Sequence, residues 1–178
     1  MRRNIIWLIG ILGLLILQTA VLLPLGVGPV NLLLVLVVVS LLFAGFDFGL
    51  GLAVGAGVIL DFLSGAPDGI FALTFVVVFL LLYFIINNVL SREPNLLILF
   101  SSVAASTISY FIFLMIFNQL FKVVHLGSEI NWRAVVLSDL PWSLFFNLLA
   151  TYPVSRYYLA FENFNQRFIK NAPQSIQT

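Results

Sequence analysis

The feature that most constrains this chain is a series of long apolar stretches containing almost no charged residues. We interpret six of them as membrane-spanning helices, at residues 5–23, 30–46, 48–63, 69–90, 96–117 and 134–158. A helix needs about 20 mainly apolar residues to cross the hydrocarbon core of a bilayer. Charged residues make up 8% of the chain and hydrophobic residues 62%, whereas soluble domains carry about 25% charged residues. The sequence therefore predicts an all-α integral membrane protein, with one six-helix domain over residues 1–160.

The placement of the basic residues predicts the orientation of these helices. Six spans put both termini on one side of the membrane, and lysine and arginine accumulate on the cytoplasmic side. With cytoplasmic termini, only Lys122 and Arg133 lie outside. The basic residues then placed inside are Arg2, Arg3, Arg92, Arg156, Arg167 and Lys170. We expect residues 161–178 to form a polar cytoplasmic tail, and the net charge of +1 gives no reason to expect a nucleic-acid partner.

Residue types that carry common enzyme chemistry are scarce in this sequence. The chain has no cysteine and a single histidine, His125. A thiol nucleophile, a thiolate metal site and a zinc site built on histidine and cysteine ligands are therefore excluded. Phosphate-binding loops and nucleophile elbows are also missing from the sequence. We therefore expect a protein that is not an enzyme and that holds no cofactor or metal.

The start of the last helix has two interpretations. The stretch "WRAVVLSDLPW" contains Pro141, so one interpretation is a helix throughout with a bend at this proline. The other is a segment at the membrane interface, followed by a helix that begins near Pro141 with Ser138 or Asp139 as its N-cap. The sequence leaves both open.

Glycines in the third helix form two stripes at four-residue spacing. Asp47, Gly51 and Gly55 make one stripe, and Gly57, Asp61 and Gly65 make the other. Small residues let two helix backbones approach closely, which favours helix association in lipid. We expect this helix to be the buried centre of the bundle. The alternative is a homodimer contact through the glycines.

Asp61 is an ionisable group inside a membrane helix, where such groups are costly and paired. It lies about one turn before the loop "SGAPDG". A carboxylate is stabilised near the N-terminus of a helix, so the amides that begin the fourth helix, together with the Ser64 hydroxyl, are candidate partners. We therefore interpret Asp61 as a latch between the third and fourth helices; a proton relay or a substrate-binding carboxylate is the alternative. The structural residues expected in this hairpin are Gly51, Gly55, Asp61, Ser64, Gly65, Pro67 and Gly69.

The same hairpin resembles the rod shape-determining protein MreD family. The stretch "GLAVGAGVILDFLSGAPDGIFAL" is similar to the family's glycine-rich helix, its aspartate before a Ser-Gly turn, and its Ala-Leu at the next helix start. Weaker similarities are "LILQ", "NLLLVLVV" and "LPW" in the first, second and last helices. The positions that match the motif are Gly51, Gly55, Asp61, Ser64, Gly65, Gly69, Ala72 and Leu73.

This resemblance implies a fold, a location and a set of partners. It implies a six-helix bundle similar to the substrate-binding subunits of energy-coupling-factor transporters, in the bacterial plasma membrane. The implied function is a scaffold of the cell-elongation machinery that binds MreC and helps regulate peptidoglycan synthesis and cell shape. The RodA glycosyltransferase and its transpeptidase partner would be reached indirectly. The alternative is a substrate-binding membrane subunit of a vitamin-type transporter.

Overall fold

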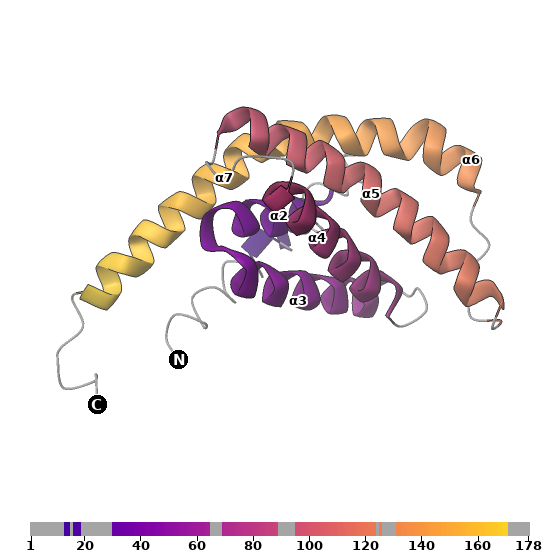
Figure 1. Ribbon diagram of the computed structural model, residues 1–178, viewed down its shortest axis with the longest axis horizontal. Helices are drawn as coiled ribbons and strands as arrows, with labels where there is room; N and C mark the ends of the chain where they lie inside the picture. The colour runs from indigo at the N-terminus through magenta and orange to yellow at the C-terminus, as the bar shows by residue number, and fades with distance from the viewer. Residues whose placement is uncertain are drawn as a thin grey trace.

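The computed structural model describes residues 13–14, 16–18, 30–64, 69–88, 95–123, 125 and 131–170. Every element of regular structure in these ranges is helical, as the sequence predicts (Figure 1). The last helix begins as a short α-helical turn and a π-helical turn before its long α-helical part. The elements are α2 (Leu32–Ala44), α3 (Phe46–Ser64), α4 (Ile70–Asn88), α5 (Leu96–Val123), α6 (Trp132–Ala134), η2 (Val135–Asp139) and α7 (Leu140–Lys170).

Four helical segments are long and apolar enough to cross a membrane. They comprise α3, α4, α5 and the continuous segment Trp132–Ala160. Their number and length indicate a multi-pass, all-α membrane protein. The first expected helix, at 5–23, lies mostly outside the described residues. The described structure therefore leaves the expected six-span count as a prediction.

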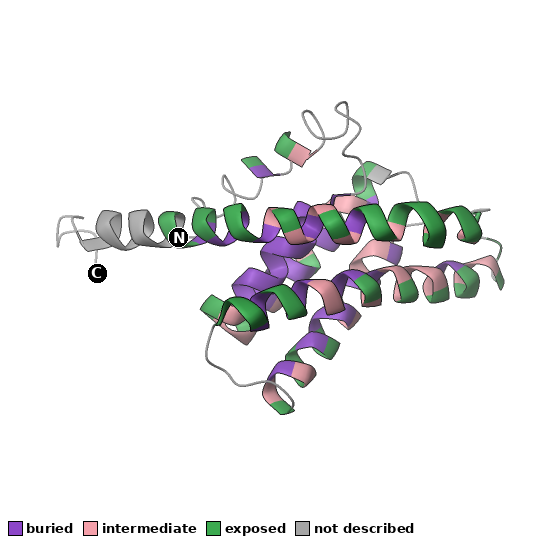
Figure 2. Ribbon diagram, turned by 90° about the horizontal axis from the view of Figure 1, so that it is seen from above, coloured by how far each residue is buried: buried purple, intermediate pink, exposed green. Residues whose placement is uncertain are grey.

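The centre of the bundle is α2, not α3 as we expected. Every residue from Leu32 to Leu41 is buried, and α2 contacts α3, α4, α5 and α7. In Figure 2 the buried segments lie at the centre of the molecule. At about 1.5 Å per residue, its 13 residues are too short to cross the ~30 Å hydrocarbon core. In contrast, α3 exposes Val54, Val58 and Phe62. A helix without a polar face is either buried or faces lipid along a full membrane span, and the short α2 takes the buried position.

The connection between α2 and α3 is a single residue, Gly45. Its φ of 92° is in the left-handed region that glycine adopts without strain. The Gly45 amide donates to the Ser40 carbonyl at 3.2 Å, and the Gly49 amide donates to the Gly45 carbonyl at 3.2 Å. Asp47 then lies in the first turn of α3, where the helix dipole favours a negative charge.

The last helix is helical from Trp132 onward, as in the interpretation of a helix throughout, and it does not begin near Pro141. Asn131, not Ser138 or Asp139, is its N-cap, and the Asn131 side chain accepts a hydrogen bond from the Ala134 amide at 3.3 Å. Both rejected residues lie within the π-helical turn η2. This turn lies immediately before Pro141, which has no amide hydrogen for the usual α-helical bond, so the wider turn fits there.

The end of this helix also differs from our expectation. We placed its end at residue 158 and a polar tail after it, but α7 continues to Lys170. In Figure 1 the last turns of α7 extend well beyond the other helices. Residues 171–178 lie outside the described ranges.

Candidate functional site

Asp61 joins α3 to the first turn of α4. Its Oδ1 accepts a hydrogen bond from the Phe71 amide at 2.8 Å, and its Oδ2 accepts one from the Ala72 amide at 3.0 Å. The Asp61 side chain is only 7% exposed. First-turn amides have no acceptor within their own helix, so the carboxylate satisfies two donors and also faces the positive end of the helix dipole. This is the geometry of a latch between the two helices.

One face of α3 packs tightly against α4. A Cβ atom added at Gly57 would meet the Ala72 Cα and would lie 2.9 Å from the Ala72 nitrogen. A Cβ added at Gly49 would lie 2.6 Å from the Phe79 ring. Gly49, Ala53, Gly57 and Asp61 follow one another at four-residue spacing and are all buried. We call these four residues the packed stripe.

The other glycine face of α3 is open. A Cβ added at Gly51 or Gly55 would meet no atom of the described residues within 4 Å. Asp47 and Gly51 are exposed, and Gly55 is partly exposed. We call Asp47, Gly51 and Gly55 the open stripe. It consists of two glycines and one exposed carboxylate, Asp47, and lies on the outside of the described helices.

Of the remaining predicted hairpin residues, the structure fully describes only Gly69. Gly69 lies in the turn before α4 with a φ of 97°, a conformation that explains the need for glycine there. Ser64 ends α3, and its side chain lies outside the described parts. Gly65 and Pro67 also lie outside the described residues.

A buried polar network at the start of α2 was missed by our reading of the sequence. The Asn147 Oδ1 accepts a hydrogen bond from the Asn31 amide at 2.8 Å, and its Nδ2 donates to the Thr107 Oγ1 at 3.0 Å. A longer bond of 3.4 Å runs from the same Nδ2 to the Ser143 Oγ. An amide inside the apolar stretch "LFFNLLA" was the available signal, because polar side chains inside membrane helices hydrogen-bond across helices.

The same network caps the N-terminus of α2 inside the bundle. The Asn31 Oδ1 accepts from the Leu34 amide at 3.0 Å, and the Gln18 Oε1 accepts from the Leu32 amide at 3.0 Å. Three helices that are distant in the sequence, α2, α5 and α7, together with Gln18, thus supply acceptors or donors around one buried point. A helix end in an apolar interior requires such partners.

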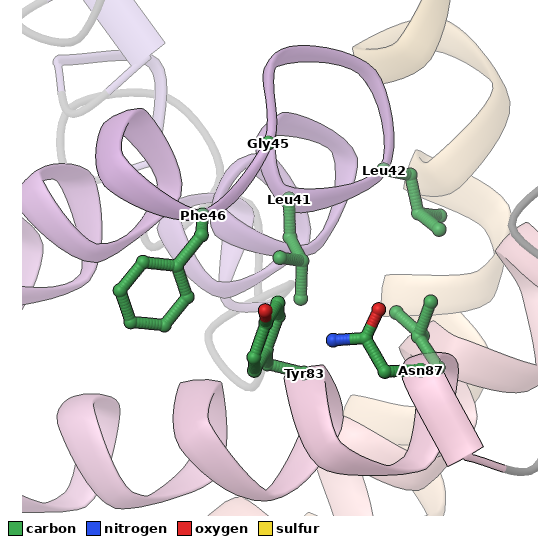
Figure 3. A pocket seen from close by; sticks show the side chains of 7 residues that line it. Leu41, Leu42, Gly45, Phe46, Tyr83 and Asn87 are labelled. Carbon is green, nitrogen blue, oxygen red and sulfur yellow. The ribbon is translucent and has the colours of Figure 1, made fainter.

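Two cavities border these elements. One, of about 300 Å³, lies between the α2–α3 turn and the end of α4 (Figure 3). Figure 3 shows Tyr83 and Asn87 extending from α4 toward Leu41 and Phe46. The Tyr83 and Phe46 rings are 4.7 Å apart between centroids.

The second cavity, of about 420 Å³, lies at the end of the bundle that holds the Asp61 latch. It combines aromatic walls with polar side chains. Its described lining residues are Gln18, Val30, Asn31, Leu60, Phe71, Tyr110, Phe111, Leu114, Asp139 and Ser143. We call it the latch-side cavity.

The fold and these sites define the class of the protein as a multi-pass, all-α membrane protein. Comparisons with protein-family models, with curated proteins and with solved structures found no match. The described residues also include no cluster of three or more histidine, cysteine or carboxylate side chains arranged to hold a metal ion.

Proposed function

We propose that this chain is a non-enzymatic membrane scaffold of the bacterial cell-elongation machinery, similar to MreD. In this proposal it lies in the plasma membrane with both termini in the cytoplasm. It binds the membrane helix and juxtamembrane part of MreC, and it acts on RodA and the transpeptidase indirectly. Through MreC it helps to regulate peptidoglycan synthesis and cell shape.

The observation that carries the proposal is the hairpin of α3 and α4. The residues that resemble the MreD motif are not scattered over the fold. Asp61 contacts the Phe71 and Ala72 amides directly, and Gly57 lets the Ala72 backbone approach. Among the residues that match the motif, Asp61 and Ala72 are therefore joined directly, which supports a structural role for this part of the motif, whereas Gly51 and Gly55 lie on the outer face of α3.

The open stripe supports the scaffold role. Gly51 and Gly55 leave space on the outer face of α3, and small residues at such a surface allow a second helix to approach closely. The membrane helix of MreC is the occupant that we propose. A second copy of this chain is the competing occupant.

Co-purification tests the proposal. The chain is expressed together with MreC in a rod-shaped bacterium, and each is purified through a tag on the other. We expect wild-type protein to retain MreC. The double substitution Gly51→Leu and Gly55→Leu should reduce retention, because the leucines fill the space that a partner helix would use.

The matched control is Ser101→Leu, which places a leucine at an exposed position of a different helix, α5. It should leave MreC retention unchanged. A wild-type protein that never retains MreC would refute the scaffold proposal. Retention by the double variant at the wild-type level would show that MreC binds elsewhere, and self-association lost in that variant would favour the homodimer.

A second candidate function is favoured by the latch-side cavity. Its volume of about 420 Å³ lies within the ~300–1,000 Å³ of small-molecule pockets, which fits the solute-binding subunit of a vitamin-type transporter. Tight binding of a vitamin by the purified protein, together with normal cell shape after depletion, would favour this candidate over the scaffold.

A further inference from the structure

We propose that the latch-side cavity binds an organic ammonium group, carried by a small molecule or by a lipid headgroup. The inference depends on the lining of the cavity alone, so it holds whether the chain is a scaffold or a transporter subunit. The charge of the lining, its aromatic walls and the helix ends beside it all bear on the sign of the ligand's charge.

The charge of the lining favours a cation. Asp139 is an exposed carboxylate on η2 that lines the cavity, and the described lining residues include no lysine, arginine or histidine. A second carboxylate, Asp61, lies next to the lining residue Leu60, and its oxygens accept from the Phe71 and Ala72 amides. An anionic ligand would face these carboxylates without a basic partner among the described lining residues.

The aromatic walls favour an organic cation over a hydrated metal ion. Tyr110 and Phe111 are adjacent on α5, with ring centroids 5.6 Å apart and planes at 86° to each other. Phe71 contributes a third ring from α4. Aromatic faces attract ammonium groups and at the same time contact their apolar substituents. Leu60 and Leu114 extend the apolar surface.

The two helix N-termini beside the cavity do not reverse this preference. The positive end of a helix dipole attracts anions, and both α2 and α4 begin here. However, the Phe71 and Ala72 amides of α4 already donate to the Asp61 carboxylate. At α2, the Leu32 and Leu34 amides already donate to the side-chain oxygens of Gln18 and Asn31. An anion would have to displace these acceptors.

The test measures choline binding to the full-length protein in nanodiscs made of phosphatidylglycerol. The comparison ligand is the neutral isostere of choline, in which a carbon atom replaces the nitrogen. Both have the same shape, so only the charge differs. We expect choline to bind at least about tenfold more tightly than the isostere, as a cation–π contact together with a nearby carboxylate would give.

Two variants locate the site. Asp139→Asn removes the charge at an exposed position, so we expect it to fold and to weaken choline binding about tenfold. Asp47→Asn removes an exposed carboxylate of α3 that does not line the cavity, and it should bind choline as the wild type does. Equal binding of choline and the isostere, equal binding by Asp139→Asn and wild type, or no choline binding at all would each overturn the proposal.

The source of the ammonium group is decided by lipid competition. Adding phosphatidylethanolamine to the nanodiscs should displace choline if a lipid headgroup is the natural occupant. Choline binding that is unaffected by this lipid assigns the cavity to a free small molecule. Neither outcome of the lipid competition bears on the proposed binding of MreC, because MreC binding is measured separately by co-purification.

Discussion

The two stripes of α3 have similar composition and equal spacing, but opposite surroundings. In the packed stripe, a Cβ at Gly57 would meet the backbone of Ala72, whereas in the open stripe a Cβ at Gly55 would meet nothing within 4 Å. These two glycines are two residues apart, which places them on different sides of the helix. The role of a glycine in a membrane helix therefore depends on its surroundings. It either allows a neighbouring helix backbone to pack closely or leaves a surface uncovered.

The largest expected effect lies at the end of the packed stripe. Asp61→Leu would leave the Phe71 and Ala72 amides without the carboxylate that accepts from them. At about 1–3 kcal/mol for each buried unsatisfied group, we expect the free energy of unfolding to fall by about 2–6 kcal/mol. Asp61→Asn should cost less, because its amide oxygen can still accept one of the two bonds. Reversible unfolding in lipid nanodiscs measures both.

Asp61→Asn also separates the latch from a role in proton or solute transport. If Asp61 is a latch, the loss of function in Asp61→Leu and Asp61→Asn should be proportional to the loss of stability, so Asp61→Asn should be the milder variant. If both abolish function equally while the folded protein accumulates normally, the ionised charge itself is required. That result would contradict the latch.

The buried amide of α7 provides a comparison outside α3. Asn147→Leu would remove the acceptor of the Asn31 amide and the donor to Thr107. We expect a loss of about 1–3 kcal/mol in the free energy of unfolding. The control is Asn88→Leu, because Asn88 is exposed and its side chain donates to Phe84 in its own helix. Equal stability of the two variants would show that the buried network contributes nothing.

Within the packed stripe, Gly49 should tolerate a methyl group better than Gly57 does. The two atoms nearest to a Cβ at Gly49 belong to the Phe79 ring, and the Leu41 Cα of α2 follows at 3.3 Å, whereas the three nearest atoms at Gly57 all belong to a backbone. We expect Gly49→Ala to cost about 1 kcal/mol. Thermal unfolding in the same nanodiscs measures it. A larger loss than for Gly57→Ala would mean that the Phe79 ring is fixed and the α2 side of the contact limits packing.

The smallest effect is expected in the open stripe. The methyl group added by Gly51→Ala would meet no atom of the described residues within 4 Å. Alanine is also favoured over glycine in a helix by up to about 1 kcal/mol. We therefore expect unchanged or slightly higher stability of the isolated protein. A clear destabilisation would mean that the open stripe is covered, and concentration-dependent stability would identify a second copy as the cover.

Much of the helical architecture could be predicted from the sequence. The apolar stretches locate α3, α4 and α5, although α5 extends past the expected end at residue 117 to Val123. The Asp61 contact was predictable because the loop between α3 and α4 is short. An aspartate one turn before that loop can reach only a few donors, and the first-turn amides of α4 are among them.

The arrangement of the helices in space could not be predicted in the same way. Which helix is central depends on contacts between distant segments, and α2 and α3 are both apolar enough to be buried. The Asn31–Asn147 pair joins residues 116 positions apart, a pairing that no local pattern encodes.

The most direct test of the central claim compares Gly57→Ala with Gly55→Ala in the same bilayer. The same methyl group is added to the same helix, two residues apart. We predict that Gly57→Ala lowers the free energy of unfolding by about 1–3 kcal/mol, while Gly55→Ala leaves it unchanged or raises it by up to about 1 kcal/mol. Equal losses for the two variants, or a larger loss for Gly55→Ala, would contradict the assignment of one stripe to packing and the other to an open surface.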